Sequence, residues 1–420
     1  MIDYPNFLDK IFDKLRIENA KAIIVGGYIR DTLLGFDSID IDIEVYNVDS
    51  FDVLQNILEE FGEINIVGKS FGVCKLKMGS YDLDFTLPRL DSKVASGHLG
   101  FDIKIDKGLN FKDAARRRDF SINAIGFDVR AKTILDPFNG LDDLKNKILK
   151  MVDAETFVDD PLRVLRAVGF CSRYNFAMHK ELFSLCFNMI KEDALHELPK
   201  ERIYEEIKKI LLRSTKPSIG FELLRELDAL KYFKNLDLLT LDDWHLIMEA
   251  LDRFASKKTT NAKTNEILML AILCYRFNKI KIEEFVISLS DDKFLLKEVL
   301  TLLHFVPKLL ELSSSAANNK ISNYDIYKLA SLVNIRNLCT LNEALFGTGE
   351  AVKLRAKELG VVDKKLKAIL MGRDLILLGL KPSTDFSNIL DASYEAQMRE
   401  EFFTRDEALK WLKNYLSNYQ

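Results

Sequence analysis

Two aspartates separated by one residue, Asp40 and Asp42, have a spacing that suits metal-dependent chemistry. They lie in a strict alternation of apolar and acidic residues, IDIDIEV (residues 39–45), which also contains Glu44. This period predicts a strand with one buried face and three carboxylates on the other. Alternate residues of a strand lie roughly 6.5 to 7 Å apart, so Asp40 and Asp42 can converge on metal ions about 3.5 to 4 Å apart. A solvated strand face would give the same pattern, so the neighbouring sequence has to decide.

A double-glycine turn precedes this strand. The apolar run 22–25 predicts a short buried strand, and Gly26 and Gly27 follow it where a residue without Cβ lets a ligand approach the backbone. A helix is expected to open at Tyr28, with unpaired backbone N–H groups at its start and Arg30 as an added cation. The turn is therefore predicted to cradle a triphosphate.

The order GG, RD and DxD resembles the signature of the polymerase-β-like nucleotidyltransferases. More narrowly, it is similar to the class II tRNA nucleotidyltransferase and bacterial poly(A) polymerase family. The resemblance implies nucleotidyl transfer with two Mg²⁺ ions held by Asp40 and Asp42. In a later predicted strand (81–87), Asp84 is expected as a metal neighbour, with plain surface charge as the alternative.

A second motif, FKDAARRRDFSINAIGF, covers residues 111–127. Three consecutive arginines alone would fit a solvated helix face. Asp119 and Asn123 are four apart and are predicted to share one helical face. The run resembles the family's RRDFTINA block, which implies that Arg118 contacts nucleotide phosphates, that Asp119 accepts hydrogen bonds from the ribose hydroxyls, and that Asn123 supports them.

A helix is predicted to begin within FVDDPLRVLRAVGFCSRY (157–174), where an acidic cap precedes a proline of the first turn. Capping by itself accounts for the two aspartates. Asp160 and Arg163 are also three apart on one face, with Arg166 one turn further. Aspartate accepts from the exocyclic amine of cytosine or adenine and arginine donates to the adjacent ring nitrogen, whereas guanine and uracil present the reverse pattern.

The same stretch resembles the family's EDxxR motif, with Asp159 where glutamate is usual. The resemblance implies that Asp160 and Arg163 read the base as a template made of amino acids. Two further blocks resemble the family. DPFNG (136–140) has Asn139 in place of a glycine, and Asn tolerates left-handed geometry. In 197–211, Arg202 and Glu205 are expected to form a structural pair.

The middle of the chain lacks one expected motif. Some bacterial members of the family carry a phosphohydrolase domain there, with a histidine followed by a His-Asp pair. Here His245 is present, but Cys274 and Tyr275 stand where the pair would be. His245 is therefore interpreted as a packed or surface residue.

A basic segment lies near the C-terminal end, with eight cations against three anions over 353–381. A solvated face is the simple explanation. However, residues 372–390, with Gln397 and 407–412, resemble the tail of bacterial CCA-adding enzymes, which grips tRNA. This resemblance implies tRNA binding by Lys364, Lys365, Lys367 and Arg373, and it disfavours poly(A) polymerase.

Length and composition limit the number of domains and the class of protein. With 420 residues, several domains are expected, and 48% hydrophobic with 30% charged residues is ordinary for a soluble globular chain. There is no apolar run of membrane-spanning length and no signal peptide, and five scattered cysteines indicate reduced core thiols, so a cytoplasmic protein is expected. The net charge of −4 requires RNA binding to rely on local charge.

The predicted fold class is α+β. A nucleotidyltransferase head (1–136) with a mixed sheet and helices is expected to precede an all-α neck (137–215), body (216–315) and tail (316–420). Expected head elements are helices over 4–18 and 51–61 and strands over 64–67 and 73–76. Residues 313–319 are expected to be a linker.

The predicted activity is template-independent addition of C, C and A to tRNA from CTP and ATP. Poly(A) polymerase, a specialist adding only CC or only A, and an inactive RNA-binding protein remain alternatives. No membrane and no obligate protein partner are indicated by the sequence.

Overall fold

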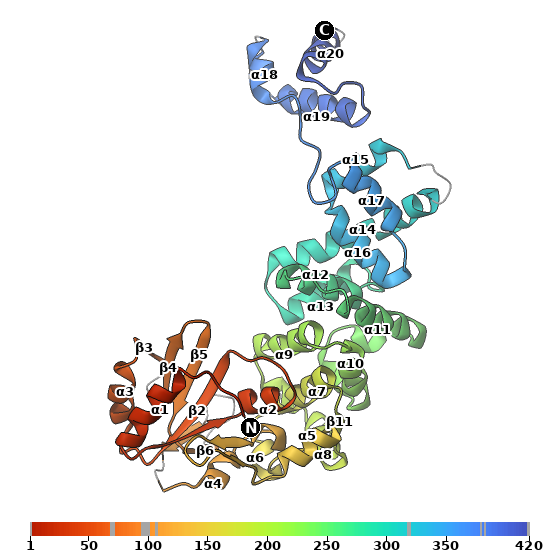
Figure 1. Ribbon diagram of the computed structural model, residues 1–420. Coiled ribbons are helices and arrows are strands. Elements are labelled where there is room, and N and C mark those ends of the chain that lie inside the picture. The colour runs from red at the N-terminus through yellow and green to blue at the C-terminus, as the bar shows by residue number, and fades with distance from the viewer. Residues whose placement is uncertain are drawn as a thin grey trace. The chain divides into compact units, whose positions relative to one another are not determined.

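The computed structural model in Figure 1 describes residues 2–67, 72–93, 101–105, 108–316, 321–378, 380–381 and 384–417. The chain divides into two compact units, Met1–Asp237 and Leu238–Gln420. Each unit is described by itself below. The finer division into head, neck, body and tail stays a prediction.

A mixed sheet forms the framework of the first unit. Seven strands of the described residues lie in the order β3 (Ile64–Val67), β4 (Val73–Met78), β5 (Tyr81–Thr86), β2 (Asp40–Tyr46), β1 (Lys21–Val25), β8 (Gly126–Asp128) and β9 (Thr133–Leu135). Strands β2 and β5 are parallel, whereas the other neighbours are antiparallel. Each strand predicted in the head is present with nearly the predicted bounds.

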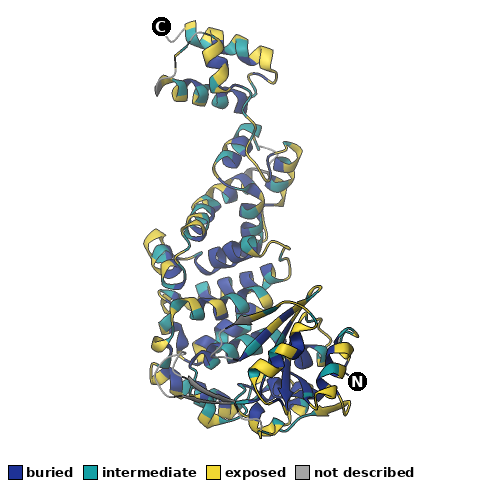
Figure 2. Ribbon diagram, turned by 90° about the vertical axis from the view of Figure 1, so that its left-hand side faces the viewer, coloured by how far each residue is buried: buried dark blue, intermediate teal, exposed yellow. Residues whose placement is uncertain are grey.

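Two helices, α1 (Leu8–Ile17) and α3 (Phe51–Glu59), pack together beside the sheet. The buried residues of α1 are Leu8, Ile11, Phe12 and Leu15, which lie on one helical face. Ser50 caps α3 by accepting a hydrogen bond from the Val53 amide at 3.3 Å. Figure 2 shows that the strands and the inward sides of the helices are the buried parts of this unit. The two helices predicted from periodicity are confirmed.

The remainder of the first unit is mainly helical. Its short elements are β6 (Arg89–Lys93), β7 (Phe101–Ile105), α4 (Phe111–Ala115), α5 (Gly140–Asn146), α6 (Ala154–Phe157), the paired β10 (Ile148–Leu149) and β11 (Ala177–Met178), and the 3₁₀ helices η1 (Ser121–Asn123), η2 (Ala194–Glu197), η3 (Ala229–Tyr232) and η4 (Leu236–Leu238). Its longer helices are α2 (Gly27–Leu33), α7 (Leu162–Tyr174), α8 (Lys180–Lys191), α9 (Lys200–Arg213) and α10 (Pro217–Glu226). Helix α7 packs against both α9 and α10. Gly220 lets α10 approach both helices closely, because a Cβ there would lie 2.8 Å from Ile210 Cγ2 on α9 and 3.1 Å from Ser172 Cβ on α7.

The DPFNG turn joins the sheet to these helices. Asn139 has φ +58°, so the left-handed geometry expected at this position is confirmed. Asp136 accepts hydrogen bonds from the amides of Gly140 and Leu141 at 2.7 and 2.9 Å. A Cβ on Gly140 would lie only 2.3 Å from the carbonyl oxygen of Ser121. The turn therefore holds α5 closely against η1.

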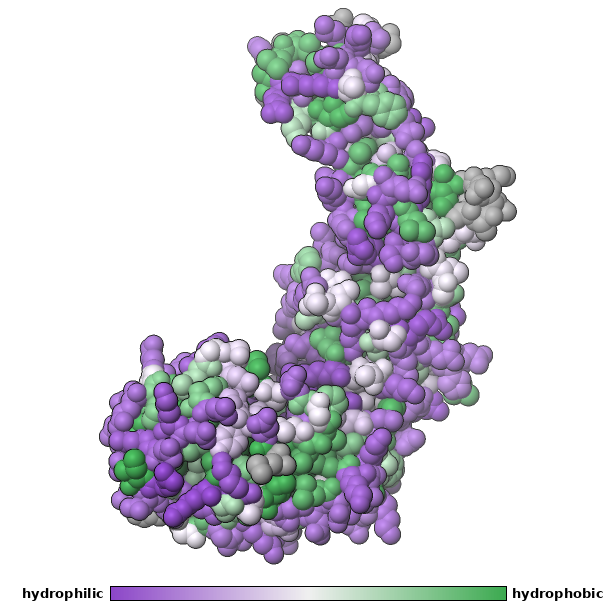
Figure 3. All heavy atoms as spheres, in the orientation of Figure 1, coloured by the Kyte–Doolittle hydropathy of each residue, from purple (hydrophilic) through white to green (hydrophobic). Residues whose placement is uncertain are grey.

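The second unit consists of helices in the described residues. They are α11 (Leu241–Ala255), α12 (Ala262–Leu273), α13 (Lys279–Leu289), α14 (Lys293–Ala316), α15 (Asn323–Leu332), α16 (Ile335–Phe346), α17 (Glu350–Glu358), α18 (Gly372–Leu377), α19 (Thr384–Met398) and α20 (Arg405–Ser417). Hydrophilic residues cover most of the surface of these helices that is visible in Figure 3. The linker predicted at 313–319 is wrong over 313–316, because α14 continues through these residues, and its remainder lies outside the described residues.

The α+β class with a mixed-sheet head followed by helices is confirmed. All five cysteines are free and buried, as expected of core thiols. Within the described part of the chain, none of the helices combines the length and the apolar character that a membrane crossing requires.

Candidate active site

At the double-glycine turn of the first unit, the backbone of Gly26 lies close to the side chains of Arg118 and Asp42. Gly26 has φ +73°, and a Cβ there would lie 2.9 Å from Arg118 Nη1 and 3.2 Å from Asp42 Oδ2. Glycine is needed for both the backbone angle and the space. A cavity of about 310 Å³ opens here. The residues that line it are Gly26, Gly27, Arg30, Asp42, Arg118, Asp119, Asn123, Arg166, Gly169, Phe170, Arg173, Glu206, Lys209 and Arg213.

Carboxylates of two neighbouring strands meet beside this cavity. In the parallel pairing of β2 and β5, Asp42 lies opposite Asp84, and Asp40 lies opposite Asp82. Partial burial raises the pKa of Asp42 above its ordinary value, Arg118 opposes the rise, and the nearby carboxylates, led by Asp84, add to it. A cation between these groups would relieve their repulsion.

Lys75 on β4 supplies one positive charge next to these carboxylates. Its Nζ lies 2.7 Å from Asp84 Oδ2. No group of three or more His, Cys, Asp or Glu side chains in the described residues forms a complete metal site. Magnesium is commonly held by one or two carboxylates together with substrate phosphates, so Asp40 and Asp42, with Asp84 beside them, fit an ion that a nucleotide completes.

Glu44 shares the strand face of Asp40 and Asp42 but has a different environment. The alternation placed it on the solvent face, which is wrong, since Glu44 is fully buried at 0% exposure. Its Oε1 lies 2.9 Å from Arg118 Nη2 and 3.1 Å from Arg117 Nη2, and Tyr46 donates a hydrogen bond to Oε2 at 2.8 Å. Burial would raise the pKa of Glu44, but the two guanidinium groups outweigh it and hold the pKa below its ordinary value. Glu44 therefore fixes Arg118 beside Gly26.

Asp119 is the centre of a buried hydrogen-bond network. Its Oδ1 accepts from the Phe120 amide at 2.9 Å and from Asn123 Nδ2 at 2.8 Å. Its Oδ2 accepts from Nε and Nη2 of Arg166 at 2.8 and 2.6 Å. Burial would raise the pKa of Asp119, but Arg166 and Asn123 hold it below the ordinary value. These bonds occupy both oxygens, so a ribose hydroxyl has to compete for one, and the ribose contact stays a prediction.

The helical face predicted for Asp119 and Asn123 is wrong. Helix α4 ends at Ala115, and Phe120 is extended, with φ −128° and ψ 148°, and forms a bridge with Met151. Phe120 is fully buried, and its burial breaks the helical path. The two polar side chains still meet, through a tight turn.

Arg30 connects the glycine turn to the neck helix α7. It is 5% exposed, its Nε donates to Asp31 at 2.9 Å, and its Nη1 donates to Asn123 Oδ1 at 2.5 Å. Its guanidinium also lies over the rings of Phe170 and Tyr174, at 4.9 and 5.2 Å from their centroids. Arg30 lines the cavity, as predicted, but its charge is already paired.

Asp160 and Arg163 do not line this cavity. Asp160 accepts from the Leu162 amide at 3.1 Å, which is the capping role that the sequence left open. Arg163 donates to the carbonyls of Thr156 and Arg117 at 2.9 and 2.7 Å. Base recognition by this pair stays a prediction and requires at least Arg163 to exchange a partner. Asp159, the other acidic residue of the motif, is partly buried.

The predicted ion pair between Arg202 and Glu205 is wrong, because each residue pairs with a different partner. Glu205 pairs with Lys208 at 2.5 Å, while Arg202 Nη2 lies 3.7 Å from Asp160 Oδ2. Arg202 therefore steadies the start of α7 rather than its own helix.

Sequence motifs did not identify part of the cavity wall. Gly169, Phe170 and Arg173 on α7, and Glu206, Lys209 and Arg213 on α9, line it from the helical side. Each set follows the 3.6-residue period, so a helical-wheel analysis could have found the stripes. The same analysis could not have shown that these residues line one cavity with Gly26.

The predicted tail residues lie in the second unit. Lys364, Lys365, Lys367 and Arg373 are all exposed. Their segment is held at both ends. Arg336 pairs with Asp363 at 2.5 and 2.7 Å, and Gln397 bonds to the carbonyl of Lys367 and the amide of Ile369 at 2.9 and 3.0 Å. Binding of tRNA by these cations stays a prediction.

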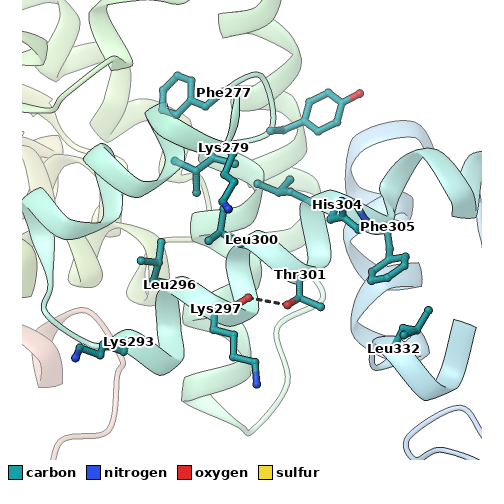
Figure 4. Close-up of a pocket in the computed structure, with 13 residues that line it drawn as sticks. Phe277, Lys279, Lys293, Leu296, Lys297, Leu300, Thr301, His304, Phe305 and Leu332 are labelled. Carbon is teal, nitrogen blue, oxygen red and sulfur yellow. Dashed lines mark hydrogen bonds between the residues drawn. The ribbon is translucent and has the colours of Figure 1, made fainter. Parts of the chain in front are cut away.

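A larger cavity of about 700 Å³ also lies in the second unit (Figure 4). Lys279, Lys293 and Lys297 surround leucine and aromatic side chains there, and the described lining residues include no carboxylate. It is therefore unsuited to metal-dependent phosphoryl transfer. His245 is exposed on α11, which agrees with its interpretation as a surface residue, and Cys274 is buried. The absence of a phosphohydrolase site stays a prediction.

Comparison with protein families agrees with this geometry. Residues 22–150 match the poly A polymerase head domain, and residues 175–239 match the probable RNA and SrmB-binding site of polymerase A. Over these two ranges the chain is therefore similar to the tRNA nucleotidyltransferase and poly(A) polymerase family. The resemblance carried by GG, RD and DxD is thereby confirmed.

Two relatives within this family have similar sequences. A CCA-adding enzyme of Francisella tularensis subsp. tularensis (strain FSC 198) is 36% identical over 214 residues, which cover 50% of this chain and 56% of the relative. A multifunctional CCA protein of Pseudoalteromonas atlantica is 36% identical over 223 residues, which cover 52% of each chain. The chain thus spans little more than half the length of these relatives.

Solved structures of the family share the fold. The Thermotoga maritima CCA-adding enzyme complexed with tRNA superposes with a TM-score of 0.71 at 21% identity, covering 99% of this chain and 97% of that one. A CCA-adding enzyme complexed with CTP gives 0.73 at 22% identity, covering 99% and 96%. At this identity the likeness establishes the fold.

Proposed function

We propose that this protein is a tRNA nucleotidyltransferase that adds C, C and A to the 3′ end of tRNA from CTP and ATP without a nucleic-acid template. One observation carries the proposal: the Asp40 and Asp42 strand lies in register with Asp84, next to a glycine turn that places Arg118 beside Asp42. The similar enzymes named above support CCA addition as the activity.

The reaction is attack of the tRNA 3′-hydroxyl on the α-phosphate of the nucleotide, with pyrophosphate leaving. Asp40 and Asp42 would hold two Mg²⁺ ions, which activate the hydroxyl and neutralise charge on the leaving group. Gly26 and Gly27 leave room for the phosphates next to the backbone, and Glu44 keeps Arg118 at that place.

The neck would choose the base. Asp160 and Arg163 can accept cytosine and adenine and reject guanine and uracil. The partner RNA would be held by the exposed cations of the second unit, Lys364, Lys365, Lys367 and Arg373. Phosphate contacts of this kind bind without reading sequence.

The activity can be tested with tRNA that lacks one, two or three of its terminal nucleotides, offered with each NTP separately and with CTP and ATP together. A CCA-adding enzyme restores CCA on all three primers and then stops. Long adenosine tails on any RNA would indicate a poly(A) polymerase, and restoration of only CC or only A would indicate a specialist. No incorporation on any primer would overturn the proposal.

Asp42→Ala tests the catalytic site directly. Losing a metal-binding carboxylate removes charge stabilisation from the transition state, so incorporation should fall by at least a hundredfold. Binding of tRNA should change little, because its phosphates are contacted elsewhere. Asp13→Ala is a matched control, since Asp13 is an exposed acid paired with Arg16 on α1. Incorporation within tenfold of wild type in Asp42→Ala would contradict the assignment.

A further inference from the structure

Two neck helices present a basic wall to the glycine turn. Arg173 on α7 and Lys209 and Arg213 on α9 line the same cavity as Gly26, Gly27 and Asp42. The helices are packed against each other, and all these residues belong to one compact unit. We refer to Arg173, Lys209 and Arg213 as the neck cations.

The other cations of the cavity are already neutralised by close carboxylates. Arg118 lies 2.9 Å from Glu44, Arg30 lies 2.8 Å from Asp31, and Arg166 lies 2.6 Å from Asp119. Each of these carboxylates is less than 10% exposed, so each of the three arginines is held close to a buried anionic partner. Such pairs fix geometry but add little net positive charge for a ligand.

Among the neck cations, Arg173 and Arg213 are less tightly paired with carboxylates than these three arginines, whereas Lys209 has a close carboxylate partner. Arg173 Nη2 lies 3.5 Å from Asp31, which already pairs with Arg30. Lys209 lies 2.7 Å from Glu206. Arg213 is exposed, and no described residue forms an ion pair with it. The positive charge that lacks a close carboxylate partner of its own is therefore carried by Arg173 and Arg213.

We propose that Arg173, Lys209 and Arg213 form the second half of the triphosphate site, facing the glycine turn. The inference rests on the proposed function, and it assigns to the neck a task in addition to base choice. Arginine and lysine bind phosphate oxygens by charge-assisted hydrogen bonds. Gly26 and the neck cations line the same cavity of about 310 Å³, so phosphates bound at Gly26 would occupy the space that the neck cations line.

The ligand chemistry distinguishes this site from a base-reading site. CTP and ATP share the triphosphate, so loss of a neck cation should weaken both nucleotides equally. A nucleoside monophosphate lacks the β- and γ-phosphates and should be affected little. Base choice should remain unchanged.

The test is equilibrium binding of CTP, ATP and CMP to the full chain in the absence of RNA, by calorimetry. Arg213→Ala and Arg173→Ala should each weaken CTP and ATP about tenfold, as expected for loss of a hydrogen bond between charged groups, and leave CMP within about twofold. Arg213→Lys should restore part of the CTP affinity. The affinity for inorganic pyrophosphate should fall in the same variants, and by a similar factor, as the affinity for CTP.

Adjacent lysines on α9 supply a matched control. Lys209 lines the cavity, whereas Lys208 pairs with Glu205 away from it. Lys209→Ala should weaken CTP and Lys208→Ala should not, and a thermal melt of both variants checks that α9 remains folded.

Several results would overturn the inference. Equal weakening of CMP and CTP would mean that the neck cations act on the base, ribose or α-phosphate. An increased KM for tRNA with unchanged CTP binding would assign them to the primer strand. Unchanged CTP and ATP binding in all three variants would also overturn it, while incorporation by the wild type would leave the proposed function intact. A wild type that binds neither nucleotide would instead count against the proposed function.

Discussion

Three acidic residues on one strand have different surroundings, although they follow a single alternation. Asp40 and Asp42 remain exposed, whereas Glu44, two residues further, is fully buried between Arg117 and Arg118. The spacing predicted the shared face because side-chain alternation is a local property of a strand. It could not predict the burial, because the arginines arrive from a segment more than seventy residues away.

Glu44→Gln should separate positioning from folding. The variant keeps the shape but removes the buried negative charge that pairs with two partly buried guanidinium groups, so the free energy of unfolding should fall by about 3 kcal/mol. Because Arg118 then loses its fixed place beside Gly26, the KM for CTP and ATP should rise by about tenfold with a smaller change in the KM for tRNA. Denaturant unfolding and steady-state kinetics measure the two effects.

Tyr46→Phe is the control for this prediction. It removes the hydrogen bond to Glu44 Oε2 but keeps the carboxylate and both arginines, so stability should fall by about 1 kcal/mol. The KM for nucleotides should then stay near the wild-type value. The positioning role of Glu44 would be contradicted if Tyr46→Phe raised the KM for nucleotides, or if Glu44→Gln left that KM unchanged.

At the scale of elements, regular periodicity was predictable and irregular backbone was not. Helices α1 and α3 and strands β2, β3, β4 and β5 follow their hydrophobic periods. Strands β8 and β9 have three residues each, which is too short for a hydrophobic period to be recognised. They form through pairing of β8 with β1 and of β9 with β8. The break after Ala115 depends on burial of Phe120 against the neck, which four-residue spacing cannot reveal.

The start of α7 allows two interpretations that can be separated. Asp160 accepts from the Leu162 amide, so Asp160→Ala should cost about 1 kcal/mol of stability in either case. If Asp160 also reads the exocyclic amine of the base, the same substitution should cost on the order of 1 to 3 kcal/mol of preference for C and A over U and G. Incorporation of all four NTPs and the melting temperature distinguish these outcomes.

Arg163→Ala completes this test. Its guanidinium holds the carbonyls of Thr156 and Arg117, so a purely structural role predicts lower stability with unchanged base choice. A role as a base reader predicts UTP and GTP incorporation approaching that of CTP and ATP. Unaltered selectivity in both variants would contradict the amino-acid template.

At the scale of the whole molecule, the proposed metal-binding carboxylates and the proposed tRNA contacts of the basic segment lie in different units. Asp40, Asp42 and helices α7 and α9 lie in Met1–Asp237, and the exposed basic segment lies in Leu238–Gln420. The net charge of −4 gives no general attraction to RNA, so local cations have to supply it. The anchoring of residues 363–369 by Arg336 and Gln397 gives Lys364, Lys365 and Lys367 a defined place in the fold.

Replacing Lys364, Lys365 and Lys367 together by alanine should therefore weaken tRNA binding and leave the KM for CTP unchanged. If each lysine neutralises one phosphate, the slope of log affinity against log salt should become shallower by about two to three. The matched control replaces Lys279, Lys293 and Lys297, which line the cavity of the same unit, and changes the net charge by the same amount (Figure 4). A defect confined to the first variant indicates a local RNA contact, because non-specific charge would weaken both equally. Equal losses in the two variants, or none in the first, would contradict tRNA binding by this segment.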